Sequence, residues 1–133
     1  MSRVLFSLQV PVRWRDLDAF NHVNNASYLG YIEEARVQWL KSLSLDWSGE
    51  SAAPILAAIT VNYRRPAGWP ETVTVELFAE RIGNKSLALG HRILSATAGD
   101  LLYADGHAVM VWVDRQGQSV LLPANIRAAC ADD

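Results

Sequence analysis

The sequence predicts an α+β fold, in which one long helix is followed by a series of antiparallel strands. Apolar residues recur with helical spacing between residues 25 and 45. Downstream, apolar and β-branched segments alternate with turn signals such as Gly83-Asn84-Lys85 and Ala98-Gly99-Asp100. Consecutive strands that follow a single helix form a sheet with the helix on one face.

The first element is expected to be a strand from Val4 to Arg15. Apolar side chains occupy alternate positions in this segment, as they do in a half-buried strand. Pro11 has no backbone N–H, so this strand should lie at an edge of the sheet or contain a bulge.

The segment from Asn25 to Leu45 is expected to form a long helix. The residues that share its apolar face are Tyr28, Ile32, Ala35, Trp39 and Leu43. An apolar face this wide predicts that the helix lies across a sheet. The spacing of three residues between Glu33 and Arg36 predicts an ion pair.

The remaining elements are expected to be strands joined by short turns. After a loop over residues 46–53, the predicted strands are Ile55–Arg65, Thr72–Ile82, Ser86–Thr97 and Leu101–Val113, followed by a short strand Val120–Leu122 and a short helix opened by Pro123. Apolar residues of both parities between Ala104 and Val113 predict that the sheet is covered on both sides. One helix cannot cover both sides, so we expect at least a dimer.

Length and composition predict one domain that covers residues 1–133. A net charge of −2 and a pI near 5.9 argue against a nucleic-acid-binding protein. Cys130 is the single cysteine, which excludes an internal disulfide, and three scattered histidines argue against a metal site. Without a signal-peptide pattern or a membrane-length apolar run, we expect a soluble cytoplasmic protein that makes no membrane contact.

Fifteen residues, from Asp16 to Gly30, hold two Asp, one His and three Asn at the predicted junction of strand and helix. A helix start offers free backbone N–H groups and the positive end of the helix dipole, which suit an anion or a reacting carbonyl. Taken singly, these residue types are common in turns and helix caps. The junction is therefore either a cap or an active site.

The string from Trp14 to Tyr28 resembles the signature of the 4-hydroxybenzoyl-CoA thioesterase-like branch of the hotdog-fold thioesterases. It combines Asp16-Leu-Asp18, then His22-Val-Asn-Asn25, then a tyrosine on the helix. The Glu-x-Ala-Arg stretch in the helix, Arg-Pro at a strand end and Lys-Ser in a hairpin also match the family. The resemblance implies an antiparallel sheet wrapped around one long central helix, and the hydrolysis of acyl-CoA to free acid and coenzyme A.

The resemblance also implies roles for individual residues. The implied catalytic residues are Asp18, as nucleophile or general base, with His22 and Asn25. Backbone amides at the helix start, near Asn24 and Asn25, would polarise the thioester carbonyl. The implied substrate-binding residues are Asn21, Asn24, Tyr28, Tyr31, Arg64 and Lys85. Asp16 is expected to fix the loop by hydrogen bonds or by pairing with a neighbouring arginine, and Glu33 is the next candidate carboxylate should Asp18 be dispensable.

One position departs from the family pattern. The family usually has glycine directly before the histidine, where this chain has Asn21. Asparagine is the next-best residue for a left-handed backbone. The missing glycine could nevertheless narrow the pocket where a thioester approaches the backbone.

The resemblance implies no cofactor and no metal, because coenzyme A is part of the substrate. It implies a homo-oligomer, either a dimer or a dimer of dimers, with active sites at the subunit interface. The chain has few basic residues near the expected site, so an acyl carrier protein stays open as an alternative substrate carrier or partner. A third alternative is an acyl-CoA-binding protein of this fold without enzymatic activity.

Overall fold

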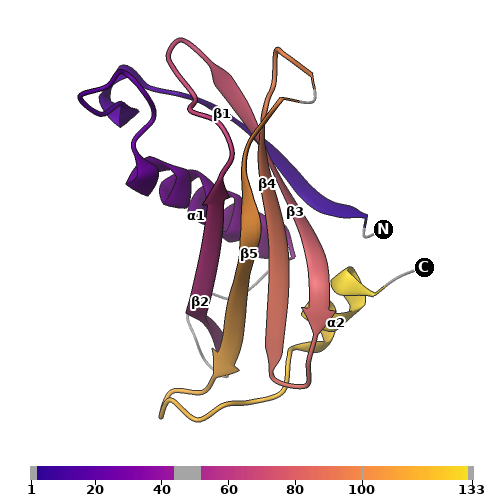
Figure 1. The fold of residues 1–133 in the computed structure, drawn as a ribbon. Coiled ribbons are helices and arrows are strands. Elements are labelled where there is room, and N and C mark those ends of the chain that lie inside the picture. The colour runs from indigo at the N-terminus through magenta and orange to yellow at the C-terminus, as the bar shows by residue number, and fades with distance from the viewer. Residues whose placement is uncertain (1–2, 44–51, 100, 132–133) are drawn as a thin grey trace.

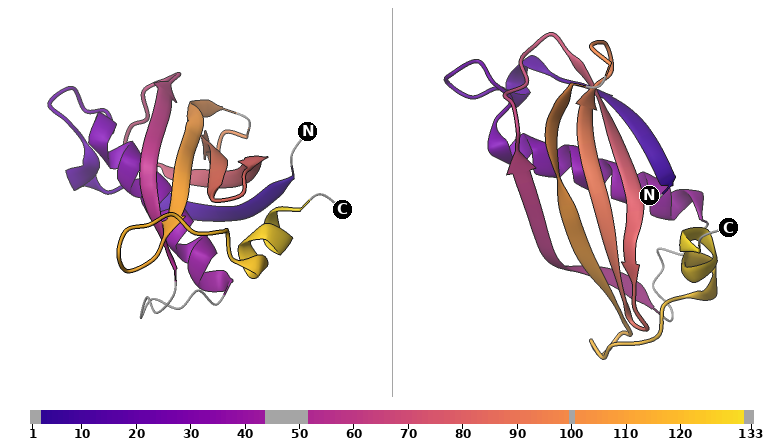
Figure 2. Two further views of the ribbon diagram at one scale, coloured as in Figure 1. Left: turned by 90° about the horizontal axis from the view of Figure 1, so that it is seen from below. Right: turned by 45° about the vertical axis from the view of Figure 1, so that its right-hand side comes forward.

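The structure is a computed structural model and describes residues 3–43, 52–99 and 101–131. Its sheet has the strand order β1-β3-β4-β5-β2, and all neighbouring strands are antiparallel. The strands are β1 (Val4–Pro11), β2 (Ala53–Tyr63), β3 (Thr72–Ile82), β4 (Ser86–Ser95) and β5 (Leu102–Val113). Helix α1 (Asn25–Ser42) lies across one face of the sheet, and the short helix α2 (Ala124–Cys130) packs beside β3 (Figures 1 and 2). This arrangement confirms the predicted α+β fold.

The ends of β2, β4 and β5 differ from the prediction by one or two residues, and two predicted strands differ more. The first strand ends at Pro11 instead of Arg15, because the chain turns into a short 3₁₀ helix, η1 (Trp14–Asp16). The predicted strand Val120–Leu122 is absent. Ser119 forms an isolated bridge with Val113, and the Val120 N–H donates to the Trp112 carbonyl oxygen at 2.9 Å. The end of the predicted helix and most of the predicted loop at 46–53 lie outside the described residues.

The two edges of the sheet differ in character. β1 forms one edge, which confirms the position expected from Pro11, and the strand also contains a bulge near Val4. β2 forms the other edge and has no charged residue over its whole length. Ile55, Leu56 and Tyr63 on β2 are each more than two-fifths exposed. The unpaired side of β2 is therefore an apolar strand edge.

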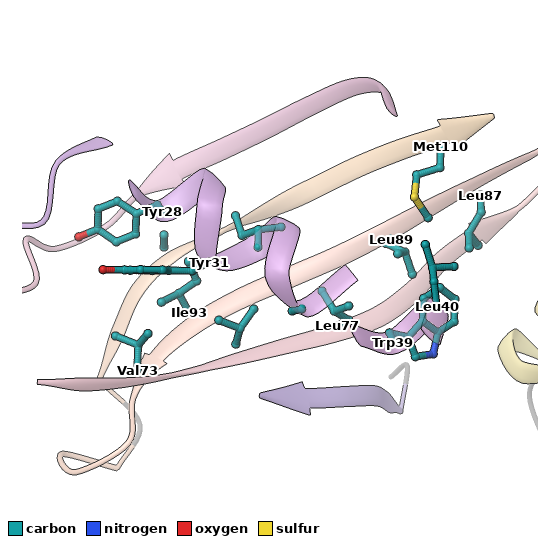
Figure 3. Packing of buried hydrophobic residues seen from close by; sticks show 14 of the residues in the cluster. Tyr28, Tyr31, Trp39, Leu40, Val73, Leu77, Leu87, Leu89, Ile93 and Met110 are labelled. Atoms are coloured by element: carbon teal, nitrogen blue, oxygen red, sulfur yellow. The ribbon is translucent and has the colours of Figure 1, made fainter. Parts of the chain in front are cut away.

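The core fills the space between α1 and the sheet. The helix buries Tyr28, Tyr31, Ile32, Ala35, Arg36, Trp39 and Leu40. They pack against inward-facing sheet residues that include Val73, Leu77, Leu89, Ile93 and Met110 (Figure 3). Burial of each large apolar side chain contributes about 1.5–3 kcal/mol, so this layer fixes the helix on the sheet. Neither helix of the described residues combines the length and hydropathy needed to span a membrane.

Arg36 differs from the sequence expectation. No ion pair joins it to Glu33 among the described residues, and its residue surface is only 7% exposed. Its Nη1 atom is buried without a hydrogen-bond partner. Burial lowers the pKa of Arg36, although the nearby charge of Glu33 acts in the opposite direction.

A buried histidine links the middle of the sheet to its apolar edge. His91 on β4 is 1% exposed, and its Nε2 lies 3.2 Å from the Thr60 carbonyl oxygen on β2. A carbonyl only accepts, so Nε2 carries the hydrogen and Nδ1 is left buried without a partner. The strand between them leaves room for the ring at Gly106, where φ is 153° and a Cβ atom would collide with the same carbonyl.

We expect His91 to make the protein less stable in mild acid. Burial, assisted by the charges of Arg36 and His107 and opposed by the Thr60 hydrogen bond and Asp105, lowers the pKa of His91 to about 4. An unfolded histidine titrates near 6.5, so between these values the unfolded chain binds the extra proton. The free energy of unfolding should therefore fall by about 1 kcal/mol per pH unit from this residue as the pH drops below 6.5.

Urea unfolding at pH 7, 6 and 5 measures this dependence. His91→Gln should remove the histidine part of the slope. His22→Gln is the matched control, because His22 is exposed and is not among the groups that shift the pKa of His91. Equal slopes for the wild type and His91→Gln would contradict the prediction.

Candidate active site at the start of helix α1

The connection between η1 and α1 is a tight turn that carries Asp18. Leu17 and Val23 form an isolated antiparallel bridge, and the Asp18 N–H donates to the His22 carbonyl oxygen at 2.8 Å. Asn21 has a φ of 63°, and its N–H donates to the Asp18 carbonyl oxygen at 3.1 Å. Asn21 thus adopts the left-handed conformation that the sequence predicted for this position.

Asp16 anchors this turn to the helix. Its carboxylate accepts the Arg13 N–H at 3.0 Å and the Tyr31 hydroxyl at 2.7 Å, and it pairs with the Arg13 guanidinium at 3.3 Å. Its backbone carbonyl accepts the Asn24 N–H at 2.9 Å and the Ser27 hydroxyl at 3.3 Å. Asp16 therefore fixes the loop by both hydrogen bonds and an ion pair, as the sequence led us to expect.

The carboxylate of Asp16 is ionised and fully engaged. Burial opposes its ionisation, but the hydrogen bonds from Arg13 and Tyr31 and the Arg13 charge outweigh burial and lower its pKa. The same contact, together with burial, raises the pKa of Tyr31, so its hydroxyl stays a donor. Neither oxygen of Asp16 is available for a substrate.

Asp18 has one oxygen held and one free. Oδ1 accepts the Phe20 N–H at 2.8 Å and the His22 N–H at 3.3 Å, so the carboxylate is fixed in orientation. Oδ2 has no hydrogen-bond partner among the described residues, and the residue is exposed. An ionised carboxylate oxygen in a fixed position can attack a carbonyl carbon or take a proton from water.

The first turn of α1 leaves one backbone donor free. Asn24 is the N-cap, and its side-chain oxygen accepts the Ala26 N–H at 2.8 Å and the Ser27 N–H at 3.2 Å. The Asn24 N–H is used by Asp16. The Asn25 N–H has no partner within the part of the chain that the structure describes. Of the two helix-start amides that the sequence suggested, the structure leaves that of Asn25 available.

The free carboxylate oxygen and the free amide belong to residues that line one cavity. Its volume is about 250 Å³, and its lining residues are Asp18, His22, Val23, Asn25, Tyr28, Tyr63, Arg64, Arg65 and Pro66. The turn and helix α1 contribute one wall, and the end of β2 with the segment after it contributes the other. The His22 ring makes no hydrogen bond to the described residues.

Tyr63 joins the edge strand to the helix start. Its hydroxyl donates to the Asn25 carbonyl oxygen at 3.0 Å, and its ring lies edge-on to that of Tyr28 with centroids 5.3 Å apart. The sequence left open whether Tyr63 lines the acyl pocket or packs behind it. Its position depends on the pairing of β2 with β5, which alternation along one strand does not reveal.

The two neighbouring arginines of the cavity differ in their availability. Arg64 is paired with Asp105 at 2.9 Å, and Asn62 donates to the same carboxylate oxygen at 3.2 Å. Arg65 is exposed and forms no ion pair with the described residues. Arg65 is therefore the cation that is free to meet an anionic group at this cavity.

A larger cavity of about 450 Å³ lies on the other flank of α1, beside the end of β1. Its carboxylates are Asp16, which is fully engaged, and Glu34, whose Oε2 accepts a hydrogen bond from Gln38 at 2.7 Å. The other oxygen of Glu34 has no partner among the described residues, but no free helix-start amide lines this cavity. The smaller cavity is the better candidate for chemistry.

The structure brings together some of the residues that the sequence singled out and separates others. Those that line the smaller cavity are Asp18, His22, Asn25, Tyr28 and Arg64. Asn21 shapes the turn, Asn24 caps the helix and Tyr31 lines the larger cavity. Lys85 lies in the β3–β4 hairpin at the opposite end of the sheet, because Ser86 is paired with Val111 near the end of β5 (Figure 1).

No group of three or more His, Cys, Asp or Glu side chains among the described residues could hold a metal ion. The chemistry open to the cavity uses a carboxylate, a backbone amide, hydroxyl groups and arginine. This set suits the attack on a polarised carbonyl.

Comparisons with known proteins agree with this geometry. The sequence model of the thioesterase-like superfamily matches residues 12–130. The long-chain acyl-CoA thioesterase FadM of Escherichia coli is 35% identical over 115 residues, which cover 85% of this chain and 86% of FadM.

Solved structures of proteins described as thioesterases are also similar to this chain. The PA2801 protein of Pseudomonas aeruginosa, a putative thioesterase, has a TM-score of 0.92 at 40% identity and covers 97% of this chain and 100% of its own. A putative acyl-CoA thioesterase from Xanthomonas campestris has a TM-score of 0.82 at 44% identity and covers 90% of this chain and 100% of its own. These findings confirm the resemblance to hotdog-fold thioesterases, and the chain belongs to the thioesterase-like superfamily.

Proposed function

We propose that this protein hydrolyses acyl-CoA thioesters to a free acid and coenzyme A, with Asp18 as the reacting carboxylate. One observation carries the proposal. The free oxygen of Asp18 and the unpartnered N–H of Asn25 belong to residues that line the same cavity. The names of the related proteins, which include acyl-CoA thioesterases, support the substrate class.

The proposed chemistry begins at the thioester carbonyl carbon. Asp18 either bonds to this carbon itself or removes a proton from a water that does so. The carbonyl oxygen gains negative charge and is stabilised by the Asn25 N–H and the positive end of the helix dipole. The C–S bond then breaks, and coenzyme A leaves as a thiolate that takes up a proton. If Asp18 has bonded to the carbon, water hydrolyses the resulting anhydride; if water has attacked, the acid product is already formed. No cofactor takes part, because coenzyme A belongs to the substrate.

The other residues support this arrangement in the proposal. Asn24 keeps the helix start in place, Asn21 shapes the turn, and Tyr31 holds Asp16. His22 borders the cavity beside Asp18 and contacts the substrate.

Asp18→Asn tests the reacting carboxylate. The amide keeps an oxygen that accepts the Phe20 and His22 N–H groups but can neither attack nor remove a proton, so kcat should fall by about 10²–10⁴-fold. Thiol release from a panel of acyl-CoA esters of increasing chain length measures the loss and also identifies the preferred acyl group.

Asp114→Asn is the matched control for this change. The Oδ1 atom of Asp114 accepts the N–H groups of Gln116 and Gln118 at 2.9 Å each. Asp18 likewise accepts the N–H groups two and four residues after it, but Asp114 lines neither of the two cavities described above. We expect its kcat to equal that of the wild type. If Asp18→Asn hydrolyses acyl-CoA as fast as the wild type, Asp18 is not part of the mechanism. If the wild type binds acyl-CoA without hydrolysing it, the result favours an acyl-CoA-binding protein.

Arg65→Gln tests how the carrier part of the substrate is held. The free guanidinium of Arg65 suits a phosphate of coenzyme A, so its loss should raise KM for acyl-CoA roughly fivefold, the scale of an exposed charge pair. The same acyl group on N-acetylcysteamine carries no phosphate and should show no change. Equal effects on both substrates would contradict the role, and much lower KM for an acyl carrier protein ester would favour that carrier.

We also propose that two copies pair through the apolar edge of β2. An exposed strand without charged residues is an aggregation hazard unless another strand covers it. Antiparallel pairing would bring the Ala53 end of one β2 beside the Tyr63 end of the other. It would also bring the partner's Lys85 end toward this protomer's cavity, where a second basic residue could meet the substrate.

Light scattering at micromolar concentration measures this state, and we expect a dimer or a dimer of dimers. Ile55→Lys places a charge on the edge and should shift the protein toward monomers. Leu121→Lys is the control, because Leu121 is 68% exposed but lies outside the sheet. A wild-type protein that is a stable monomer would contradict the proposed pairing and the contribution of the partner to the cavity.

A further inference from the structure

Three tyrosines surround the start of α1, and they differ in how they use their hydroxyl hydrogen. The ring of Tyr28 lies edge-on to that of Tyr31, with centroids 6.3 Å apart, and to that of Tyr63 at 5.3 Å. Figure 3 shows Tyr28 and Tyr31 next to each other at this end of the helix. Tyr28 therefore packs against both of the other rings, and these contacts restrain the position of its hydroxyl group.

Two of these tyrosines donate inside the protein. The Tyr31 hydroxyl donates to Asp16 at 2.7 Å, and the Tyr63 hydroxyl donates to the Asn25 carbonyl oxygen at 3.0 Å. Their hydrogens are therefore occupied.

Tyr28 is the exception. Its hydroxyl oxygen accepts the Ala67 N–H at 3.2 Å, and a peptide N–H can only donate. The hydroxyl hydrogen of Tyr28 therefore has no acceptor among the described residues. Because the residue is only 2% exposed, this hydrogen is a buried donor whose partner has to come from the neighbouring space.

The neighbouring space is the candidate active site. Tyr28 lines the same cavity as Asp18 and Asn25. Burial raises the pKa of Tyr28, and the nearby charge of Asp18 acts in the same direction despite the opposing Ala67 hydrogen bond. The Tyr28 hydroxyl therefore keeps its hydrogen at neutral pH, where carboxylates are ionised.

We propose that the Tyr28 hydroxyl donates to the thioester carbonyl oxygen and forms, with the Asn25 N–H, a two-donor site for the oxyanion. This inference rests on the proposed thioesterase function and adds a catalytic residue to it. The Ala67 N–H fixes the phenol oxygen from one side and leaves its hydrogen for the substrate. A donor that is already in place stabilises the negative charge as it develops without reorganising at that moment.

Tyr28→Phe tests the inference, because phenylalanine retains the ring packing and removes only the hydroxyl. Loss of one oxyanion donor costs about 10²–10³-fold in kcat. We expect a loss of this size in kcat, a KM within about threefold of the wild type and an unchanged pH profile, since the titrating carboxylate is still present.

Tyr103→Phe is the matched control. Tyr103 is also buried and also loses one hydroxyl hydrogen bond, to Glu71, but it lies outside the cavity. It should show a comparable loss in melting temperature with an unchanged kcat. Replacement of Tyr28 by 3,5-difluorotyrosine, assayed at pH 6 where this more acidic phenol still carries its hydrogen, retains the donor and should restore kcat to within about threefold of the wild type.

The outcomes separate this inference from the proposed function. A Tyr28→Phe enzyme with wild-type kcat, a kcat loss equal to that of Tyr103→Phe, or failure of difluorotyrosine to restore activity would each overturn the role of Tyr28 alone. A kcat loss that Tyr103→Phe shares would assign the hydroxyl a purely structural function. A wild-type protein that hydrolyses no thioester at all would overturn both proposals.

Discussion

The arrangement of the candidate site depends on the buried carboxylate of Asp16. Its side chain accepts the Arg13 N–H and the Tyr31 hydroxyl, and its backbone carbonyl accepts the Asn24 N–H. Asp16 therefore connects η1, Tyr31 on helix α1 and the N-cap residue Asn24 to one another. Asp18 lies in the turn that follows this anchor, and Asn25 follows the N-cap residue that the anchor holds. The anchor therefore acts on both of the groups that the proposed reaction uses.

The edge strand connects this site to the rest of the molecule. Tyr63 is the last residue of β2, and its hydroxyl holds the Asn25 carbonyl oxygen. Farther along the same strand, Thr60 accepts the hydrogen bond from the buried ring of His91. β2 is also the apolar strand edge that we propose to pair with a second copy. In the proposed pair, covering that edge would restrain the strand that contacts the helix start and would couple assembly to the geometry of the site.

The sequence predicted the elements of the fold better than it predicted the partners of single residues. The helix, the antiparallel strands and the left-handed Asn21 follow from local spacing and backbone preference, and all three are observed. The pairing of Arg64 with Asp105 joins residues far apart in sequence through the β2–β5 register, which no local pattern encodes. Burial of Arg36 likewise reflects its tertiary position, and it overrides the ion pair that helical spacing favours.

A second turn in the same chain shows what distinguishes Asp18 from a structural aspartate. Asp114 begins a turn with the same hydrogen bonds, the same flanking bridge and a left-handed fourth residue, which there is Gly117. The turn that carries Asp18 is therefore an ordinary backbone structure, and Asn21 fills the position that glycine fills in its counterpart. Local geometry alone does not make an active site. Asp114 has no helix start with a free amide beside it and lines neither of the two cavities described above, so the tertiary setting decides which of two equivalent carboxylates can react.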